Sequence, residues 1–362
     1  MTDLSQLPLR DDLVGRKPYG APQLNVSVAL NVNENTHRIP EEVAVDIIQR
    51  IAAAVLEVNR YPDREFTGLR TALAKYIERE VTPEQVWAAN GSNEVLQHIF
   101  QAFGGPGRTA LSFTPSYSMY PLLAEATGTK FVGIPRAERF ALTPKLVTEA
   151  IEEHKPNIIL ICSPNNPTGT PVDLEVIDAA YEAADTYGGI LVVDEAYAEF
   201  AHDTRDTAIN LLYGRPRLLI SRTMSKAFAF AGARVGYLIA DPAVIDALRL
   251  VRLPYHLSAF TQAAAEAALA HSAALLANVD DIRKQRDRIV EELAAMGLDV
   301  YESDSNFVLF GGLEDPEAVW QALLDQDVLV RNVGIPGTLR VTAGTASETT
   351  AFLNALRAAL GK

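Results

Sequence analysis

The chain has 362 residues, 48% hydrophobic and 22% charged, the composition of an ordinary globular protein with a sizeable core. Its formal net charge of −14 argues against nucleic acid or an anionic membrane as a partner, because both require a basic face. The single Cys162 excludes internal disulfides and fits a reducing cytoplasm. No segment resembles a signal peptide or a membrane span. We therefore expect a cytoplasmic protein with one large domain and a smaller companion.

Helical and strand-like segments alternate through the middle of the chain. Residues 41–58 place apolar side chains at helical spacing after Pro40. Short apolar, β-branched runs follow, most of them separated by helical patterns, in QVWAANG, TALSFTP, KFVGIP, NIILICSP, GILVVDEAY, RLLISRT and GYLIAD. Apolar runs without alternation are typical of parallel strands covered on both faces. We predict an α/β fold with a mostly parallel central sheet and helices on both faces.

The character of the sequence changes after VRLPYHL. A long helical stretch over about 258–296 leads to the segment DVYESDSNFVLFGG, a helix near 315–326, the short runs VLVRNVG and LRVTAG, and a terminal helix. This order predicts a smaller α+β unit. We divide the chain into an N-terminal arm that packs with the small domain, a large ligand-binding domain and a small C-terminal domain, at residues 1–40, 41–253 and 254–362.

Several familiar catalytic signatures are absent from the sequence. There is no Walker-type glycine loop, no G-x-G-x-x-G after a strand and no G-x-S-x-G elbow. The six histidines show no metal-ligand spacing, so we expect no metal site. Cys162 ends an apolar strand, where a buried small hydrophobe is the simpler interpretation.

Polar segments follow four of the predicted strands. NGSNE follows QVWAA, SPNNPTG follows NIILIC, DEAY follows GILVV and TMSK follows RLLIS. Each alone has an ordinary explanation, because such a loop is usually a turn, a strand-end aspartate is often a helix cap and most lysines are exposed. Open α/β sheets, however, build their sites at the carboxyl ends of strands, so four such segments together indicate a functional site.

One chemistry needs all four segments, that of pyridoxal phosphate. Its lysine bonds to the cofactor aldehyde and must be available as a neutral amine, with a pKa lowered by burial and by nearby cations. An acid must pair with the pyridinium nitrogen so that the ring stays protonated and accepts electrons. Lys226 of TMSK can be the lysine and Asp194 of DEAY the acid.

The remaining polar residues supply a phosphate site and contacts to the cofactor ring. A helix N-terminus with small hydroxyl residues and an arginine can hold a phosphate. Five residues suit that role: Ser92, Asn93, Thr223, Ser225 and Arg234. Asn166 and Tyr197 can hydrogen-bond the phenolic oxygen of the ring, and Tyr117 offers a face to stack on it.

At these residues the sequence resembles the fold-type I, aspartate-aminotransferase-like superfamily and, within it, the histidinol-phosphate aminotransferases. The resemblance covers almost the whole chain. It rests on LNVNENTHRIP, NRYPD, ANGSNE, FTPSYSMY, CSPNNPTG, VDEAY, RTMSKAFAFAGARVGY and the late VLVR…LRVTAGT, in the order of the family. One departure is visible, because Thr36 and His37 stand where the family usually has a proline after NEN.

The resemblance implies the same roles for the residues above and adds further ones. Lys226, Asp194 and Tyr197 match the family's catalytic residues. Tyr61 of NRYPD matches a tyrosine that reaches the cofactor phosphate of the neighbouring subunit, which implies a homodimer with shared sites. Arg331 and Arg340 match the pair that grips the anionic end of the substrate. The resemblance also places three residues among those that line the substrate pocket, namely Tyr19, Asn33 and Tyr255, and Asn93 could face the imidazole.

The activity that the resemblance implies is transfer of an amino group between L-glutamate and imidazole acetol phosphate in histidine biosynthesis. The nearest alternative is an aromatic amino acid aminotransferase of the same subfamily, which shares nearly all of these motifs. A threonine-phosphate decarboxylase would keep the cofactor and change the reaction. A non-catalytic regulator on the same fold is disfavoured, because the chain has no appended DNA-binding segment and the wrong charge for DNA.

Overall fold

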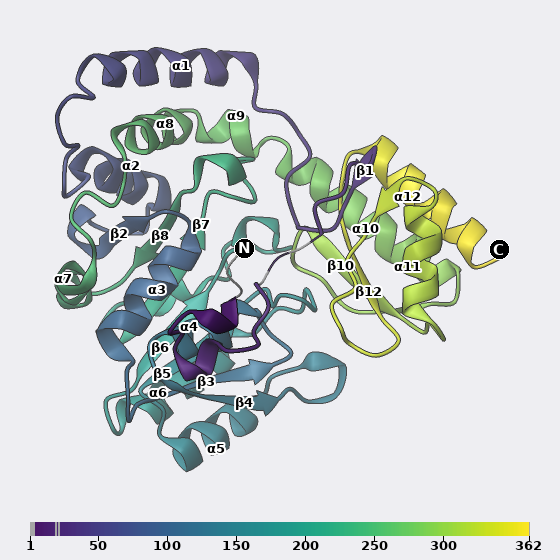
Figure 1. Cartoon of the computed structure of the whole chain (residues 1–362), viewed down its shortest axis with the longest axis horizontal. Helices are drawn as coiled ribbons and strands as arrows, with labels where there is room; N and C mark the ends of the chain where they lie inside the picture. The colour runs from purple at the N-terminus through teal and green to yellow at the C-terminus, as the bar shows by residue number, and fades with distance from the viewer. Residues whose placement is uncertain (1–3, 19, 21, 362) are drawn as a thin grey trace.

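The computed structural model describes residues 4–18, 20 and 22–361, and a seven-stranded sheet lies at the centre of that part (Figure 1). Its strands follow the order β2-β8-β7-β6-β5-β3-β4. β8 runs antiparallel to both neighbours, and the other six strands point in one direction. The predicted mostly parallel α/β sheet is therefore confirmed. The strands are β2 Val86–Ala89, β3 Thr109–Thr114, β4 Lys130–Pro135, β5 Ile158–Cys162, β6 Ile190–Asp194, β7 Leu218–Thr223 and β8 Gly236–Ile239.

The three middle strands of this sheet carry the residues that matter most for the site. Every residue of β5, β6 and β7 is buried, which explains their continuous apolar sequences. Cys162 pairs in register with Asp194, and Asp194 pairs with Ser221. The carboxyl ends of these strands therefore lie side by side, and the loops that follow them meet at one edge of the sheet.

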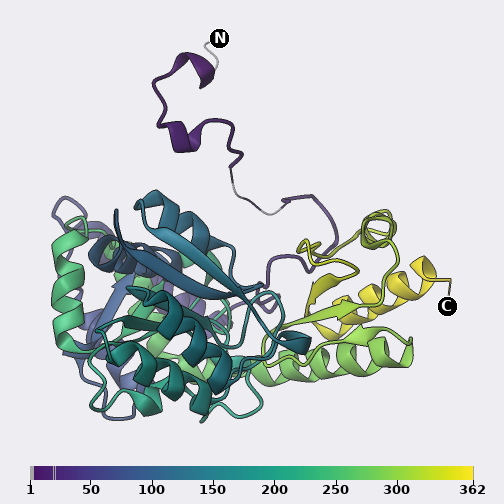
Figure 2. The ribbon, with the colours of Figure 1, turned by 90° about the horizontal axis from the view of Figure 1, so that it is seen from below.

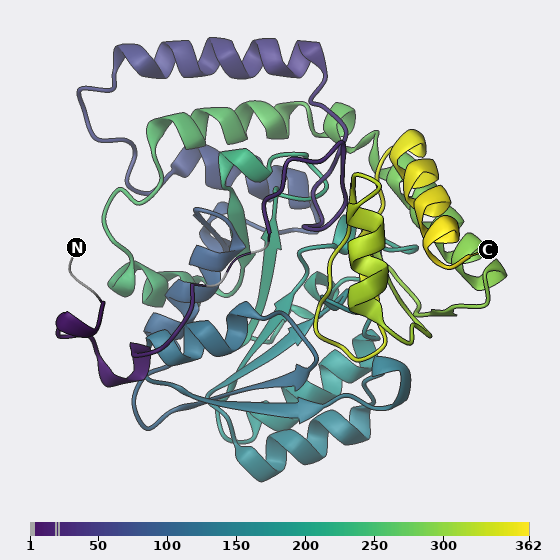
Figure 3. The ribbon, with the colours of Figure 1, turned by 45° about the vertical axis from the view of Figure 1, so that its right-hand side comes forward.

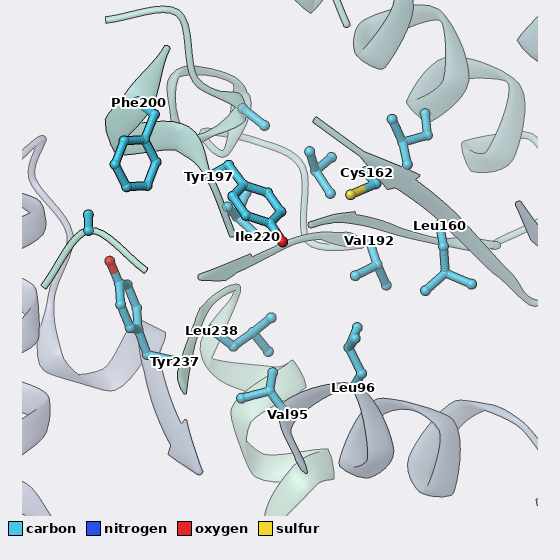
Figure 4. Close-up of a cluster of buried hydrophobic side chains, with 14 of the residues drawn as sticks. Val95, Leu96, Leu160, Cys162, Val192, Tyr197, Phe200, Ile220, Tyr237 and Leu238 are labelled. Carbon is cyan, nitrogen blue, oxygen red and sulfur yellow. The ribbon is translucent and has the colours of Figure 1, made fainter. Parts of the chain in front are cut away.

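Helices cover both faces of the sheet and supply its two hydrophobic layers. On one face, Val95 and Leu96 of α3 point toward the strand residues Val192 and Leu238 (Figure 4). α5 and α6 pack against each other, and α6 contacts β6. The helices of the large unit are α1 Glu41–Leu56, α2 Thr67–Ile77, α3 Ser92–Phe103, α4 Met119–Ala126, α5 Pro144–His154, α6 Leu174–Asp185, α7 Pro242–Val251 and α8 Ala259–Ala270. Short 3₁₀ helices lie at Leu4–Gln6, Asp11–Leu13, Pro83–Gln85, Glu138–Phe140, Ala198–Phe200, Ala208–Leu211 and Ala231–Ala233.

A smaller α+β unit lies beside the large one (Figure 1). It contains an antiparallel sheet in the order β12-β10-β9, and β1 of the N-terminal segment pairs in parallel with β11. Its elements are β1 Val28–Ala29, α9 Ser272–Leu276, α10 Val279–Ala295, β9 Asp299–Val300, β10 Phe307–Gly311, α11 Pro316–Leu324, β11 Val328–Leu329, β12 Leu339–Thr342 and α12 Ala346–Ala359. α8 packs against α1 and α2 of the large unit, and α10 then runs into the small one. The domain boundaries drawn from the sequence stay a prediction.

The first turns of the chain stand away from the body of the molecule (Figure 2). Beyond these turns, Arg16 pairs with Glu125 of α4, so the N-terminal segment contacts the large unit at this point. Farther along the same segment, β1 pairs with β11 of the small unit. Among the described residues, none of the helices combines the length and apolar character needed to cross a bilayer.

Candidate active site

A cavity of about 800 Å³ opens where the loops after β2, β3, β5, β6 and β7 meet the small unit. Its walls come from segments far apart in the sequence, including the N-terminal segment and the last third of the chain. Thirteen of the sixteen site residues predicted from the sequence line it: Asn33, Ser92, Asn93, Tyr117, Asn166, Asp194, Tyr197, Thr223, Ser225, Lys226, Arg234, Arg331 and Arg340.

Lys226 follows β7 and points its amine into this cavity. Its Nζ donates a hydrogen bond to the carbonyl oxygen of Val32, 3.1 Å away. Burial lowers the pKa of this amine to about 8, and the positive charges of Arg340 and Arg234 contribute to that lowering, while Glu34 opposes them. Close to half of the amine is therefore neutral at pH 8, which is the form that attacks a carbonyl group.

Asp194 ends β6 and is almost completely buried. Its Oδ2 accepts a hydrogen bond from the Tyr120 hydroxyl at 2.9 Å, whereas Oδ1 has no partner among the described residues. Burial raises the pKa of this carboxyl to about 6, against the opposing effect of the Tyr120 hydrogen bond. Above pH 6 the cavity therefore contains a carboxylate with an unused oxygen. A protonated ring nitrogen is the kind of partner that such an oxygen requires.

The start of α3 provides an anion site beside the lysine. Gly91 occupies the N-cap position and has no side chain to cap the helix, so N–H groups of the first turn are left for a ligand. A Cβ at Gly91 would overlap the Arg234 guanidinium, and one at Gly236 would overlap the backbone nitrogen of Ser92. Both glycines thus allow the helix start, β8 and the arginine to approach one another closely.

Two hydroxyl residues and the arginine complete this anion site. The Thr223 hydroxyl donates to Ser225 Oγ at 3.0 Å, and Arg234 Nη1 donates to the same oxygen at 3.4 Å. Arg234 adopts a left-handed backbone conformation with φ +57°, which follows the turn at Ala231–Ala233. The charge, the hydroxyls and the helix N-terminus together fit a phosphate group.

A hydrogen-bonded network joins three segments at the opposite wall. The Tyr197 hydroxyl oxygen accepts from Asn33 Nδ2 at 3.0 Å and from Asn166 Nδ2 at 3.3 Å. Arg340 Nη1 donates to Asn166 Oδ1 at 2.6 Å, and a guanidinium is a donor only, which fixes the orientation of that amide. Both lone pairs of the phenol oxygen are therefore occupied, and its own hydrogen is available to an acceptor elsewhere in the cavity.

Tyr117 and Asn93 contact each other at the cavity wall. The Tyr117 hydroxyl donates to Asn93 Oδ1 at 2.9 Å. The Tyr117 ring meets the ring of Tyr120 edge to face, with centroids 5.6 Å apart. These contacts hold the Tyr117 ring in place, so that it presents a fixed aromatic surface to a ligand.

Two arginines of the small unit face the cavity from strand-paired backbone. Arg331 and Arg340 exchange both of their backbone hydrogen bonds, at 2.9 and 2.8 Å, which places the two side chains next to each other. The Arg340 guanidinium also lies over the Phe307 ring at 4.9 Å and donates to the carbonyl oxygen of Asn31. A pair of cations at one wall fits an anionic group on a substrate.

Two predicted residues that the structure describes, Tyr61 and Tyr255, do not line the cavity. Tyr61 and Tyr255 stack on each other, with ring centroids 4.4 Å apart, and Tyr61 is 79% exposed. Tyr19 lies outside the described residues. Sequence reasoning also missed Tyr120, the hydrogen-bond donor to Asp194. The only signal for it was an aromatic residue three positions after Tyr117, a pattern that a packed helix explains equally well.

Residues 25–356 match the model of the family described as Aminotransferase class I and II. The chain belongs to the class I and II aminotransferase family. A histidinol-phosphate aminotransferase of Paenarthrobacter aurescens is 61% identical over 357 residues, which cover 99% of this chain and 96% of that protein. The corresponding protein of Frankia casuarinae is 58% identical over 360 residues, with 98% and 90% covered. The family and the enzyme class predicted from the motifs are confirmed.

Solved structures of aminotransferases share this fold. The histidinol-phosphate aminotransferase of Sinorhizobium meliloti, determined in complex with pyridoxal-5'-phosphate, aligns with a TM-score of 0.87 at 24% identity over 99% of both chains. An aspartate aminotransferase of Thermus thermophilus aligns with a TM-score of 0.81 at 26% identity, over 97% of this chain and 99% of that one. The cavity of this aminotransferase fits the same class of cofactor, because it combines an anion site, a lysine and a carboxylate oxygen with no partner among the described residues.

Proposed function

We propose that this aminotransferase uses pyridoxal phosphate to transfer the amino group between L-glutamate and imidazole acetol phosphate, giving 2-oxoglutarate and L-histidinol phosphate. The observation that carries the proposal is the convergence of Lys226, Asp194 and the anion site at the start of α3 on one cavity. The names of the relatives at 61% and 58% identity support the choice of substrate.

Lys226 is the catalytic base in this proposal. When bound, pyridoxal phosphate supplies an aldehyde for exchange with amines and a ring that delocalises the electrons left when the substrate Cα loses its proton. As a neutral amine, Lys226 takes the proton from the substrate Cα and then delivers it to C4′ of the cofactor. A base both accepts and releases a proton efficiently when its pKa lies near the working pH. The pKa of the Lys226 amine, about 8, is close to neutral pH.

The other residues of the cavity bind and orient the cofactor. Asp194 pairs its free Oδ1 with the ring nitrogen and so keeps that nitrogen protonated. Tyr197, whose oxygen already accepts two amide hydrogen bonds, donates its hydrogen to the ring oxygen. Ser225, Arg234 and the N-terminus of α3 would hold the phosphate group of the cofactor, and Tyr117 would cover one face of its ring.

Arg331 and Arg340 bind the anionic end of either substrate. The two substrates share no side chain, but one presents carboxylates and the other a phosphate, and a planar guanidinium binds both groups in a bidentate manner. In a protein of net charge −14, this pair makes the cavity wall locally positive and attracts an anion that the rest of the surface repels.

We also propose that the protein is a homodimer in which Tyr61 completes the site of the neighbouring subunit. Figure 1 and Figure 3 show α1 along the outer edge of the molecule, beyond α8. Apolar residues of α1 are exposed there, and Leu253 and Tyr61 are 76% and 79% exposed. A second copy is the partner that accounts for these exposed apolar side chains and gives Tyr61 a cavity to reach.

We propose a cytoplasmic location for the dimer. The one thiol, Cys162, is buried and free, as expected for a protein that forms no internal disulfide.

A half-reaction panel tests the proposed substrate. The purified holoenzyme is mixed separately with L-histidinol phosphate, L-glutamate, L-phenylalanine and L-tyrosine, and the change in cofactor absorbance is followed by stopped flow. We expect fast conversion with the first two amines and slow conversion with the aromatic ones. Faster conversion with phenylalanine than with histidinol phosphate would identify an aromatic amino acid aminotransferase instead. Release of CO₂ without use of an oxo acid would indicate a decarboxylase.

A further inference from the structure

Tyr120 lies behind the cavity, in the first turn of α4, and its side chain is completely buried. It lines none of the cavity, yet its hydroxyl donates to Asp194 Oδ2 at 2.9 Å. Among the described residues, it is the one side chain that hydrogen-bonds this carboxylate. Burial raises the pKa of the Tyr120 phenol well above 10, so the group remains a donor throughout the working pH range.

We infer that Tyr120 is a positioning residue that keeps Asp194 ionised and directs Oδ1 of that carboxylate toward the cofactor nitrogen. A carboxylate has two oxygens, and the hydrogen bond from Tyr120 occupies one of them. The other is left with no partner in the described part of the chain and can face the cavity. This inference rests on the proposed pairing of Asp194 with the cofactor ring.

The other titratable groups around Asp194 do not provide the same support. Cys162, on the adjacent strand β5, is neutral because burial raises the pKa of its thiol to about 12. Glu195, the next residue along the chain, would repel the charge of Asp194, but it is paired with Arg222 at 2.7 Å. The Tyr197 phenol is buried, which raises its pKa, and its hydroxyl is bonded to Asn33 and Asn166. The Tyr120 hydroxyl is thus the neutral side-chain donor that opposes the cost of burying this charge, together with the backbone N–H of Ala196.

The ring and the hydroxyl of Tyr120 have separable tasks. The ring packs edge to face against Tyr117, which is proposed to stack on the cofactor. Tyr120→Phe removes the hydroxyl and keeps this packing. A matched control is Tyr187→Phe, which removes a partly buried hydroxyl that donates to the Pro156 carbonyl oxygen at 3.1 Å, outside the cavity.

The test measures the Kd of the apoenzyme for pyridoxal phosphate between pH 5.5 and 8.5, by quenching of intrinsic fluorescence. The wild-type affinity is expected to fall as the pH drops through about 6, where Asp194 becomes protonated. Loss of a hydrogen bond to a charged group raises a carboxyl pKa by about one unit or more. For Tyr120→Phe, the fall in affinity for pyridoxal phosphate therefore begins about one pH unit higher than in the wild type. At pH 6 the variant binds roughly fivefold more weakly, and at pH 8.5 the two proteins differ by less than about twofold. Tyr187→Phe keeps the wild-type profile.

A second substitution moves the profile in the opposite direction and keeps the shape of the core. Tyr120→3-fluorotyrosine has a more acidic phenol and is a stronger donor, so the fall in affinity shifts to lower pH. A loss of affinity that is equal at every pH, or a wild-type profile in both Tyr120 variants, would overturn the inference.

A double-mutant cycle separates this inference from the proposed role of Asp194. Asp194→Asn is expected to weaken binding and to remove the pH dependence near 6, and Tyr120→Phe is expected to add nothing in that background. An additive further loss means that Tyr120 acts on its own and overturns the inference. If Asp194→Asn changes neither the affinity nor its pH dependence, the proposed pairing of Asp194 with the cofactor fails. If only Tyr120→Phe is without effect, that pairing stands and the role of Tyr120 fails.

Discussion

Gly91 is the residue at which backbone geometry most directly controls the anion site. Its backbone, at φ +80° and ψ 165°, lies in a region that is open essentially to glycine alone. The Arg234 guanidinium also occupies the space that a Cβ at this position would need. Gly91→Ala therefore strains the backbone and pushes the arginine away from the start of α3.

These two effects differ in size and in what they change. The backbone strain costs about 1–3 kcal/mol of folding free energy. Displacing Arg234 costs the bound phosphate a charge-assisted hydrogen bond, about 1.5–3 kcal/mol, which corresponds to roughly a 10- to 150-fold weaker Kd for pyridoxal phosphate. Gly188→Ala is the matched control, because Gly188 has φ +84° and, apart from its two chain neighbours, none of the described residues places an atom within 4 Å of where its Cβ would lie.

Two measurements separate the strain from the displacement. Urea unfolding of the apoenzymes reports the strain, and we expect both Gly91→Ala and Gly188→Ala to be less stable than the wild type. Fluorescence titration with pyridoxal phosphate reports the displacement, and only Gly91→Ala should show the weaker Kd. A wild-type Kd for Gly91→Ala, or equal losses of affinity in both variants, would show that Arg234 does not contact the phosphate from the space beside Gly91.

Three further predictions concern the lysine, the phenol network and the dimer. The rate at which the apoenzyme takes up pyridoxal phosphate should rise with pH and level off above about 8, because only neutral Lys226 attacks the aldehyde. Lys226→Ala should show neither turnover nor the visible absorbance of the lysine-bound cofactor. A Lys226→Ala variant that kept both would refute the assignment. Asn33→Asp replaces a donor to Tyr197 by an acceptor, so in spectrophotometric pH titration the bound cofactor should change its visible absorbance at a higher pH than in the wild type, with kcat about tenfold lower; an unchanged titration would contradict the proposed network. Leu253→Asp should convert the dimer to a monomer in sedimentation velocity, whereas Tyr213→Asp, at a 97% exposed site, should remain dimeric, and equal behaviour of the two would argue against this interface.

Local sequence determined the elements of the large domain and the residues that end its strands. Continuous apolar runs predicted buried parallel strands, and in such a sheet Asp194 and Lys226 must emerge at the same edge. The helical stretch expected over 258–296 is instead three helices, α8, α9 and α10. The break after α8 lies at His271, whose ring nitrogen contacts Asp46 of α1, a tertiary contact that no local pattern encodes.

Contacts between distant segments became visible only in the folded chain. The Tyr120 hydroxyl meets Asp194 across 74 positions of sequence, and Asn33 meets Tyr197 across 164. Such contacts depend on how α4 and the N-terminal segment pack, and in both pairs the same residue types would be equally ordinary as core or turn residues. The local sequence was therefore enough to predict which groups carry the chemistry, because strand ends and loop motifs are local. The folded chain determined which donor holds each group and in what direction, because hydrogen bonds require atoms within about 3 Å whatever their separation in sequence.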